Sequence, residues 1–264
     1  MPRLPTQVEA AVWRADQIGN ERSRVLPTGF QALDQALPGG GWPCASITEV
    51  LQLQPTVAEW RLLGPALKTA MEKGVELVLI GPPKLPHLPG LRLAGIDERR
   101  VIWVQAESPA QRLWTTEQLI KANTMAVLMA WLPQVRPEQL RRLQVCAASA
   151  DSPVFLFRPA SAQHQASAAP LRLIAEADVD WQLHVRVLKR RGPTIDETLT
   201  LRSVPAGLDA LITPRIAKPS SLFAARRRHQ HDPLQTFLSQ ADPDVVGSLP
   251  SASSVSFGRR APAH

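Results

Sequence analysis

The sequence predicts an α/β fold: a mostly parallel β-sheet flanked by helices, with an antiparallel extension near the C-terminal end of the folded core. Short apolar runs alternate with helical patterns from Ser46 onward, as in chains that build parallel sheets through helical crossovers. Each run is bounded by polar residues, Pro or Gly, which suits strands buried on both faces. After Arg158 the pattern changes to alternation with period two, which is typical of antiparallel strands.

The first element expected is an amphipathic helix over about residues 6–19, which Gly19 ends. Its apolar residues share one helical face and are Val8, Ala11, Val12, Ala15 and Ile18. Such a helix can dock on the same domain or on a neighbouring one. Together with the linker that follows, it makes up the first of three expected segments, residues 1–24.

The second segment is a single folded core over residues 25–212. It opens with a stretch that reads as helix, glycine turn and buried first strand of a nucleotide-binding sheet, at residues 26–34, 37–43 and 46–51. Further buried strands are predicted at residues 75–80, 101–104, 126–132 and 154–157. The antiparallel strands follow at residues 171–174, 181–188 and 198–204.

Three helices are expected between the buried strands. The first follows the first strand and carries its apolar residues at helical spacing between Trp60 and Met71. Ser108 caps the second helix, with Pro109 in its first turn, and Pro137 opens the third. Strand, helix and strand repeated in this way predict a parallel sheet with right-handed crossovers.

The third segment, residues 213–264, is rich in Pro, Ser, Ala and Arg. It offers too little apolar surface to offset the entropy of ordering, so we expect a disordered basic tail. Two short motifs interrupt it: a basic cluster, and a group with the i, i+3, i+4 spacing of a short partner-binding helix. Their residues are Arg226, Arg227 and Arg228, and Leu234, Phe237 and Leu238.

Composition narrows the class of protein. The formal net charge of +7 attracts polyanions or acidic partners, and nucleic acid is the first candidate. Cys44 and Cys146 lie far apart without metal-ligand spacing, so they are expected to be reduced core thiols in a cytoplasmic protein. No apolar run reaches the roughly 18 residues that a membrane span needs. No metal is assigned, because His229 and His231 lack further ligands at zinc-site spacing.

The loop after the first strand is the most informative feature of the chain. A nucleotide-binding sheet carries a glycine-rich loop here, followed by Lys and Ser or Thr, because backbone N–H groups cradle phosphate only where the turn admits close approach. The residues at positions 52–60 are Gln-Leu-Gln-Pro-Thr-Val-Ala-Glu-Trp. They include no glycine and no lysine, so we expect a protein that binds partners and has lost hydrolysis.

Several segments, taken in order and at fitting spacings, carry a resemblance. They are Thr28-Gly29, Leu33-Asp34, Gly39-Gly-Gly-Trp-Pro43, Ile47 to Leu51, Leu91 to Val101 and His184-Val-Arg-Val-Leu-Lys-Arg-Arg191. Over about residues 25–202 they resemble the ATPase core of the bacterial recombinase RecA, and most closely its ImuA branch. The resemblance implies a RecA-like core with a degenerate nucleotide site.

The catalytic positions implied by the resemblance are occupied by unsuitable side chains. The phosphate-binding lysine falls on Ala58 and the magnesium-binding hydroxyl on Glu59. The acidic positions after the strand that starts at Val75 fall on Gly81 and Pro83, and the metal-ligating aspartate falls on Ala130. Without these groups nothing stabilises charge on a transferring phosphoryl group. The expectation is a pseudo-ATPase that is no enzyme and holds no cofactor.

One basic element does match the resemblance. Lysines on a late strand of RecA reach across the filament interface towards the neighbour's nucleotide, and here they fall on Lys189 and Arg191. The hypothesis is that these cations are offered to a RecA protomer at a filament end. The competing interpretation is a solvated basic strand end at a hairpin.

Other candidate sites carry less chemistry. Residues 161–169 take the place of a DNA-contacting loop but contain no Lys, Arg or aromatic residue, so only weak nonspecific DNA contact is expected. No Gly-x-Ser-x-Gly elbow follows a strand, and His87 lies in a proline-rich loop better suited to partner contact than to hydrolase chemistry. Six of the seven tryptophans divide into core candidates, Trp60, Trp103 and Trp131, and candidates for an interface or partial burial, Trp13, Trp42 and Trp114.

The resemblance implies a non-catalytic adaptor in the SOS response and in DNA repair. Its implied partners are RecA, ImuB (an inactive Y-family polymerase relative) and, through ImuB, an error-prone replicative-type DNA polymerase in translesion synthesis. Two alternatives remain open. One is a cell-division inhibitor resembling SulA, which binds the tubulin-like division GTPase, and the other is an active recombination ATPase with an unconventional site.

Overall fold

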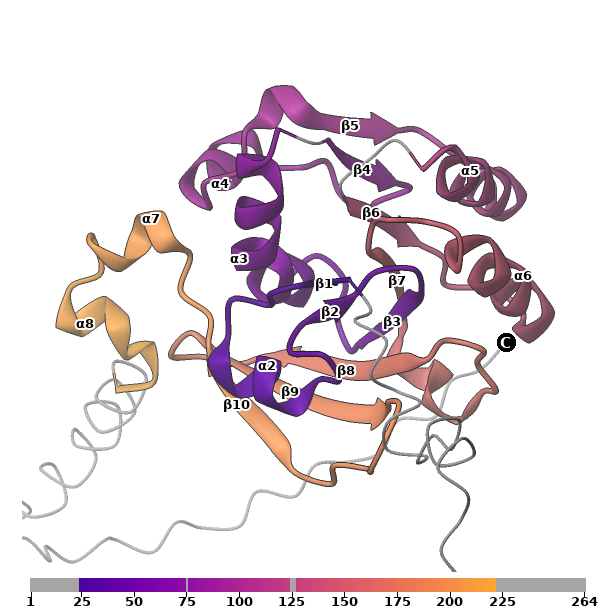
Figure 1. The fold of residues 1–264 in the computed structure, drawn as a ribbon. Coiled ribbons are helices and arrows are strands. Elements are labelled where there is room, and N and C mark those ends of the chain that lie inside the picture. Colours follow the sequence, from indigo (N-terminus) through magenta and orange to yellow (C-terminus); the bar gives the residue numbers. More distant parts are fainter. Residues whose placement is uncertain (1–23, 75, 124–126, 222–264) are drawn as a thin grey trace, which may run out of the picture. The chain divides into compact units, whose positions relative to one another are not determined.

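The computed structural model describes residues 24–221, apart from residue 75 and residues 124–126. In this part of the chain one mixed sheet has the strand order β10-β9-β8-β3-β7-β6-β4-β5 (Figure 1). All neighbours from β8 to β5 pair in parallel, which confirms the mostly parallel α/β sheet. The strands are β3 (Ile47–Gln52), β4 (Leu77–Ile80), β5 (Val101–Val104), β6 (Val127–Trp131), β7 (Val154–Pro159), β8 (Leu171–Ala177), β9 (Gln182–Lys189) and β10 (Thr198–Arg202).

Helices cover both faces of the sheet. On one face lie α2 (Gln31–Ala36), α3 (Ala58–Glu72) and α4 (Leu88–Leu93), and on the other lie α5 (Pro109–Ala122) and α6 (Pro137–Ala147) (Figure 1). Because side chains alternate along a strand, each buried strand serves both layers. In β3, Val50 packs in the layer of α3, whereas Ile47 packs in the layer of α6.

The helix starts predicted from Ser and Pro are confirmed. Ser108 Oγ accepts a hydrogen bond from the Gln111 N–H (3.2 Å), and Gln111 Oε1 accepts one from the Ser108 N–H (3.1 Å). This capping box satisfies two backbone donors that the first turn of a helix leaves without partners. Pro137 occupies the first position of α6, where its missing N–H costs nothing.

The entry to the core differs from the expected helix over residues 26–34. The chain first forms β1 (Val25–Leu26), which pairs antiparallel with β2 (Trp42–Pro43) in a separate small sheet. The helix α2 begins only at Gln31. Between them the Thr28 N–H donates to Asp34 Oδ1 at 2.8 Å, which bends the chain into the helix. The glycine turn is needed for packing, since a Cβ on Gly41 would lie 2.5 Å from the Leu26 carbonyl oxygen.

The C-terminal extension also differs in one respect from the antiparallel strands expected. β8 pairs in parallel with β3, and only β9 and β10 run antiparallel to their neighbours. The chain leaves β7, crosses the end of β3 through the 3-10 helix η2 (Ala160–His164) and returns in the direction of β3. Period-two alternation identifies a strand with one exposed face, but it does not fix the direction of its partner.

Two short elements between β4 and β5 were not expected. The proline-rich loop leads into α4, which His87 caps by accepting the Gly90 N–H on Nδ1 (3.2 Å). The 3-10 helix η1 (Glu98–Arg100) follows, and Asp97 caps it through the Arg99 N–H. Prolines at the start of a helix are tolerated, so the loop composition concealed a helix start.

Ordered contacts continue past the boundary expected at Ile212. Two short helices, α7 (Ala206–Asp209) and α8 (Pro214–Ala217), follow β10, and Trp181 Nε1 donates to the Ile216 carbonyl at 3.1 Å. The predictions for the N-terminal helix and the two tail motifs lie outside the described residues. They concern residues 6–19, Arg226, Arg227 and Arg228, and Leu234, Phe237 and Leu238.

Candidate functional site at the carboxyl edge of the sheet

The turn between β3 and α3 is filled by a carboxylate of the chain itself. Ligands of open parallel sheets bind at the carboxyl ends of the strands, and this turn leaves the central strand there. Glu59, in the first turn of α3, is fully buried. Its Oε1 accepts the Thr56 backbone N–H at 2.7 Å, and its Oε2 accepts a hydrogen bond from Gln52 Nε2 at 2.7 Å.

This arrangement decides what the turn can bind. A backbone N–H and the positive end of a helix favour an anion at this place, and Glu59 supplies that anion from within the chain. Ala58, at the position implied for the phosphate-binding lysine, is buried and carries no charge. A phosphate brought to the turn would meet a buried carboxylate at short range, and like charges repel strongly where water is excluded.

The carboxyl end of β4 is closed by an arginine. Gly81 has a φ of +59°, and a Cβ there would lie 2.6 Å from Arg112 Nε. Arg112 projects from α5, and its Nε donates to the Ala106 carbonyl at 2.8 Å. The guanidinium therefore packs directly on the Gly81 backbone. Pro83, at a position where the resemblance places an acid, is exposed in the loop that follows.

The carboxyl end of β6 is apolar. Ala130 is fully buried, and Trp131 stacks on Phe157 of β7 with ring centroids 4.7 Å apart and an interplanar angle of 24°. The Trp131 indole Nε1 has no hydrogen-bond partner among the described residues. These side chains offer no oxygen to a metal ion where the resemblance places an aspartate.

The structure separates the two late cations. Lys189, the last residue of β9, donates from Nζ to the Ser167 carbonyl at 3.0 Å and so holds the loop that precedes β8. Arg191 lies in the turn beyond β9, is exposed, and makes no hydrogen bond or ion pair within the described part of the chain. Both cations are exposed, but only the guanidinium of Arg191 has all its donors unused within the described part of the chain.

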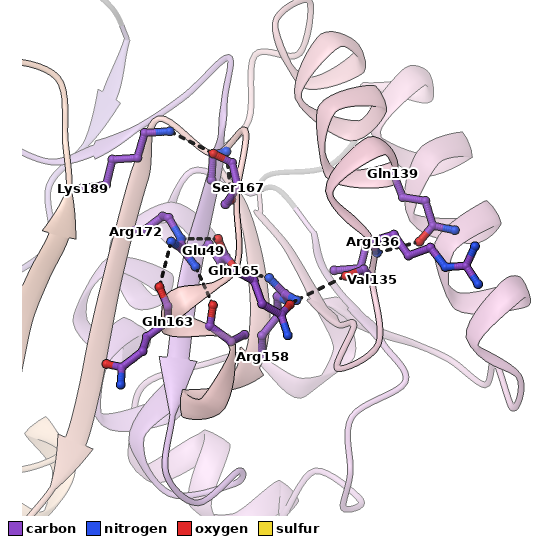
Figure 2. Close-up of polar contacts among 12 residues, drawn as sticks. Glu49, Val135, Arg136, Gln139, Arg158, Gln163, Gln165, Ser167, Arg172 and Lys189 are labelled. Carbon is purple, nitrogen blue, oxygen red and sulfur yellow. Dashed lines mark hydrogen bonds and ion pairs between the residues drawn. The ribbon is translucent and has the colours of Figure 1, made fainter.

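A buried charge cluster lies on the α6 side of the sheet next to this edge (Figure 2). Glu49 in β3 is fully buried between two arginines on the neighbouring strands. Its Oε1 accepts from Arg158 Nη1 of β7 at 2.5 Å, and its Oε2 accepts from Arg172 Nε of β8 at 2.6 Å. Glu49 and Arg172 are direct partners in the parallel register, so the pleat points both side chains to one face.

The remaining donors of the two arginines hold the loop between β7 and β8 (Figure 2). Arg172 Nη2 donates to the Ala162 carbonyl at 3.0 Å, and Arg158 Nη2 donates to Gln165 Oε1 at 2.6 Å. Arg158 Nη2 also reaches the Val135 carbonyl at 3.2 Å, while its Nε has no partner among the described residues. The loop expected at a DNA-contacting position is thus fastened to the sheet by buried cations.

The sequence interpretation missed this cluster, although a signal was present. Glu49, Arg158 and Arg172 are charged residues within or directly after apolar strand runs. A charge at such a position is buried, and buried charges are paired. The pattern could have indicated that these three residues interact, but not which two strands flank β3.

Two tryptophan assignments were wrong. Trp42, expected at an interface or partly buried, is fully buried and packs edge to face on Phe155 at 5.3 Å between ring centroids. Trp103, expected in the core, lies on the edge strand β5 and is 38% exposed. An apolar run does not reveal whether its strand ends up at a sheet edge. Trp114 on α5 is exposed, which suits an interface candidate.

Two kinds of site are absent from the described residues. No group of three or more His, Cys, Asp and Glu side chains is placed to hold a metal ion. None of the described helices combines the length and the apolar character that crossing a membrane requires.

Comparison with known proteins gives no assignment: no protein-family model and no curated protein sequence matches this chain.

Proposed function

We propose that this chain is a non-catalytic RecA-like adaptor of the ImuA kind, acting in the SOS response and DNA repair. In this proposal it supports error-prone translesion synthesis through contacts with RecA and ImuB. ImuB in turn brings an error-prone replicative-type polymerase. In this proposal the chain acts by binding partners on its surface. The side chains at the carboxyl edge of the sheet stabilise the fold and do not bind or hydrolyse nucleotide.

The fold is compatible with a RecA-like core. A mostly parallel sheet flanked by helices has its first buried strand, β3, between β7 and β8, and antiparallel strands only at one edge. Two of the segments that carry the resemblance can be located in this fold. Thr28 and Asp34 are joined by a hydrogen bond, and residues 184–191 run along β9 into the turn with Arg191.

The observation that carries the proposal is the hydrogen-bonded Glu59 carboxylate in the β3–α3 turn. A working phosphate loop needs backbone N–H groups and a lysine directed at the nucleotide. Here the Thr56 N–H is already satisfied by Glu59, and Ala58 carries no charge. A turn built this way supports the proposal of a pseudo-ATPase. Ala130, which stands where the resemblance implies a metal-ligating aspartate, is buried and has no group that could bind a metal ion.

The test is co-purification of the full-length tagged chain with untagged RecA and, separately, with untagged ImuB. The proposal expects retention of both proteins. Arg191→Glu is expected to weaken retention of RecA by about 5-fold or more, because a charge reversal at an interface rim costs several-fold in affinity. Arg141→Glu on α6, another exposed arginine without an ion pair in the described residues, is the matched control and should retain RecA normally.

Two results would contradict this proposal. One is retention of neither RecA nor ImuB by the folded chain. The other is retention of the tubulin-like division GTPase in their place, which would favour the SulA-like alternative.

A further inference from the structure

An apolar groove runs along α3, on the face of the sheet that α3 and α4 both cover. It has a volume of about 530 Å³ and lies between α3, α4 and the loop at residues 203–205. Its apolar walls are formed by Phe30, Trp60, Pro65, Leu91, Ala94 and Val204. The groove extends from Trp60 to Glu72, which is about 18 Å along a helix that rises 1.5 Å per residue.

The groove passes over a glycine that the fold itself does not need. Gly64 lies inside α3, and a Cβ built on it would meet nothing within 4 Å. A glycine in the middle of a helix costs about 1 kcal/mol relative to alanine. Small residues at such positions let another backbone approach closely, so Gly64 suits a groove into which a second helix packs.

We propose that residues 6–19 of this same chain dock in the groove as a helix. The sequence gives this segment an apolar face made of small and medium side chains, with Ala11 and Ala15 near its centre. A helix of that length spans about 21 Å, which matches the groove along α3. Alanines at the centre of the face allow the close approach that Gly64 permits.

The path of the chain places the groove within reach. The described chain begins at Arg24, five residues after Gly19, and five residues later Gly29 lies in the groove wall. Gly29 contacts α3 so closely that a Cβ on it would lie 2.3 Å from the Cβ of Pro65. The ten residues from Gly19 to Gly29 span at most about 36 Å, so the groove lies within reach of the segment. A short tether gives a local concentration in the millimolar range.

Charges at the rim favour the same occupant. Lys68 is exposed at the groove and makes no ion pair within the described part of the chain. Arg61 holds the loop wall by donating from Nε to Ser203 Oγ at 2.8 Å. Glu9 and Asp16 follow residues of the apolar face and lie on its flank, where they can meet the Lys68 ammonium.

The experiment measures how fast single introduced cysteines of the full-length chain react with a maleimide, with labelled peptides identified by mass. Ala11→Cys lies on the apolar face and Gln17→Cys on the opposite face of the same segment. Docking predicts that Cys labelling at position 11 is about 10-fold or more slower than at position 17, because a docked residue reacts only when the segment opens. Adding Gly64→Leu, which fills the groove where space is open, should make the two rates equal.

Three outcomes would overturn the proposal. One is an equal labelling rate at positions 11 and 17 in the chain with Gly64. Another is protection of position 11 that persists with Gly64→Leu when circular dichroism shows the variant folded, and also persists with Trp60→Asp. The third is protection that disappears on dilution, since that would place the segment in the groove of a second copy.

Discussion

The Glu49 carboxylate in the central strand lies 2.5 Å from Nη1 of Arg158, a residue that is 109 positions later in the chain. Both side chains are buried, and Arg172 adds a second guanidinium to the same carboxylate. A single anion thus balances two cations inside the protein. Removing one partner of a buried ion pair leaves an uncompensated charge, which costs far more than the pair itself contributes.

Glu49→Gln is therefore expected to lower the free energy of unfolding by about 3–5 kcal/mol, because two buried guanidinium groups lose their counter-charge. Urea unfolding followed by circular dichroism measures the effect. Asp209→Asn is the matched control, since its ion pair with Arg202 is exposed at both ends and contributes less than about 1 kcal/mol. Equal midpoints for the two variants would show that the cluster does not hold the sheet together.

Acid is expected to remove the contribution of Glu117. The hydrogen bond from Lys121, together with Arg142, holds the pKa of the Glu117 carboxyl below its ordinary value of 4.5. A carboxyl whose pKa is lower in the folded state stabilises the protein above pH 4.5, and this stabilisation is lost as the pH falls through the folded pKa.

Glu117→Gln should thus lower stability at pH 7 by about 1 kcal/mol, and this loss should shrink as the pH falls from 7 to 3. Urea midpoints of both proteins at the two pH values test this. A difference that grows towards low pH would show that the sign of the pKa shift is wrong.

Cys44 is expected to react slowly with iodoacetamide. Burial raises the pKa of its thiol above the ordinary value of 9.0, with Arg24 opposing the effect. Little thiolate is then present at neutral pH, and the thiolate is the reactive form. Labelling of Cys44 should lag behind that of the more exposed Cys146 at pH 7.5. Faster labelling of Cys44 would contradict its place in the core.

An acid restored at the end of β6 is expected to damage the fold. Ala130 is fully buried in the apolar layer that α5 and α6 cover, so an aspartate there would bring a charge into apolar surroundings. We expect Ala130→Asp to cost more than about 3 kcal/mol in the free energy of unfolding. Val145→Asp, at an exposed position of α6, is the control and should change it far less. A stable Ala130→Asp protein would mean that the carboxyl end of β6 still accommodates a metal-ligating side chain.

Much of the fold could be predicted because its signals are local. The apolar runs placed β3 to β7 within a few residues, and Ser108 and Pro137 placed the starts of α5 and α6. The direction of β8 could not be predicted, because it depends on where the chain re-enters the sheet after β7. The exposure of Trp103 likewise depends on β5 lying at the edge of the sheet, and the residues of β5 alone do not indicate that position.

The site was predicted in part. The sequence identified the turn after β3 as unusual, and it identified Ala58, Glu59, Pro83 and Ala130 as side chains unsuited to nucleotide chemistry. It did not reveal that Glu59 folds back onto the Thr56 N–H, because that contact depends on the path of the turn. The Glu49 cluster joins residues more than 100 positions apart, and only the strand order brings them together.

Loss of the nucleotide site is tested by equilibrium binding of fluorescently labelled ATP, with magnesium, to the full-length chain. We expect no saturable binding up to millimolar nucleotide, and no gain with Glu59→Gln alone, because the turn still lacks a lysine. Saturable binding that ordinary ATP displaces, and that a substitution at Thr56 or Glu59 abolishes, would contradict this expectation.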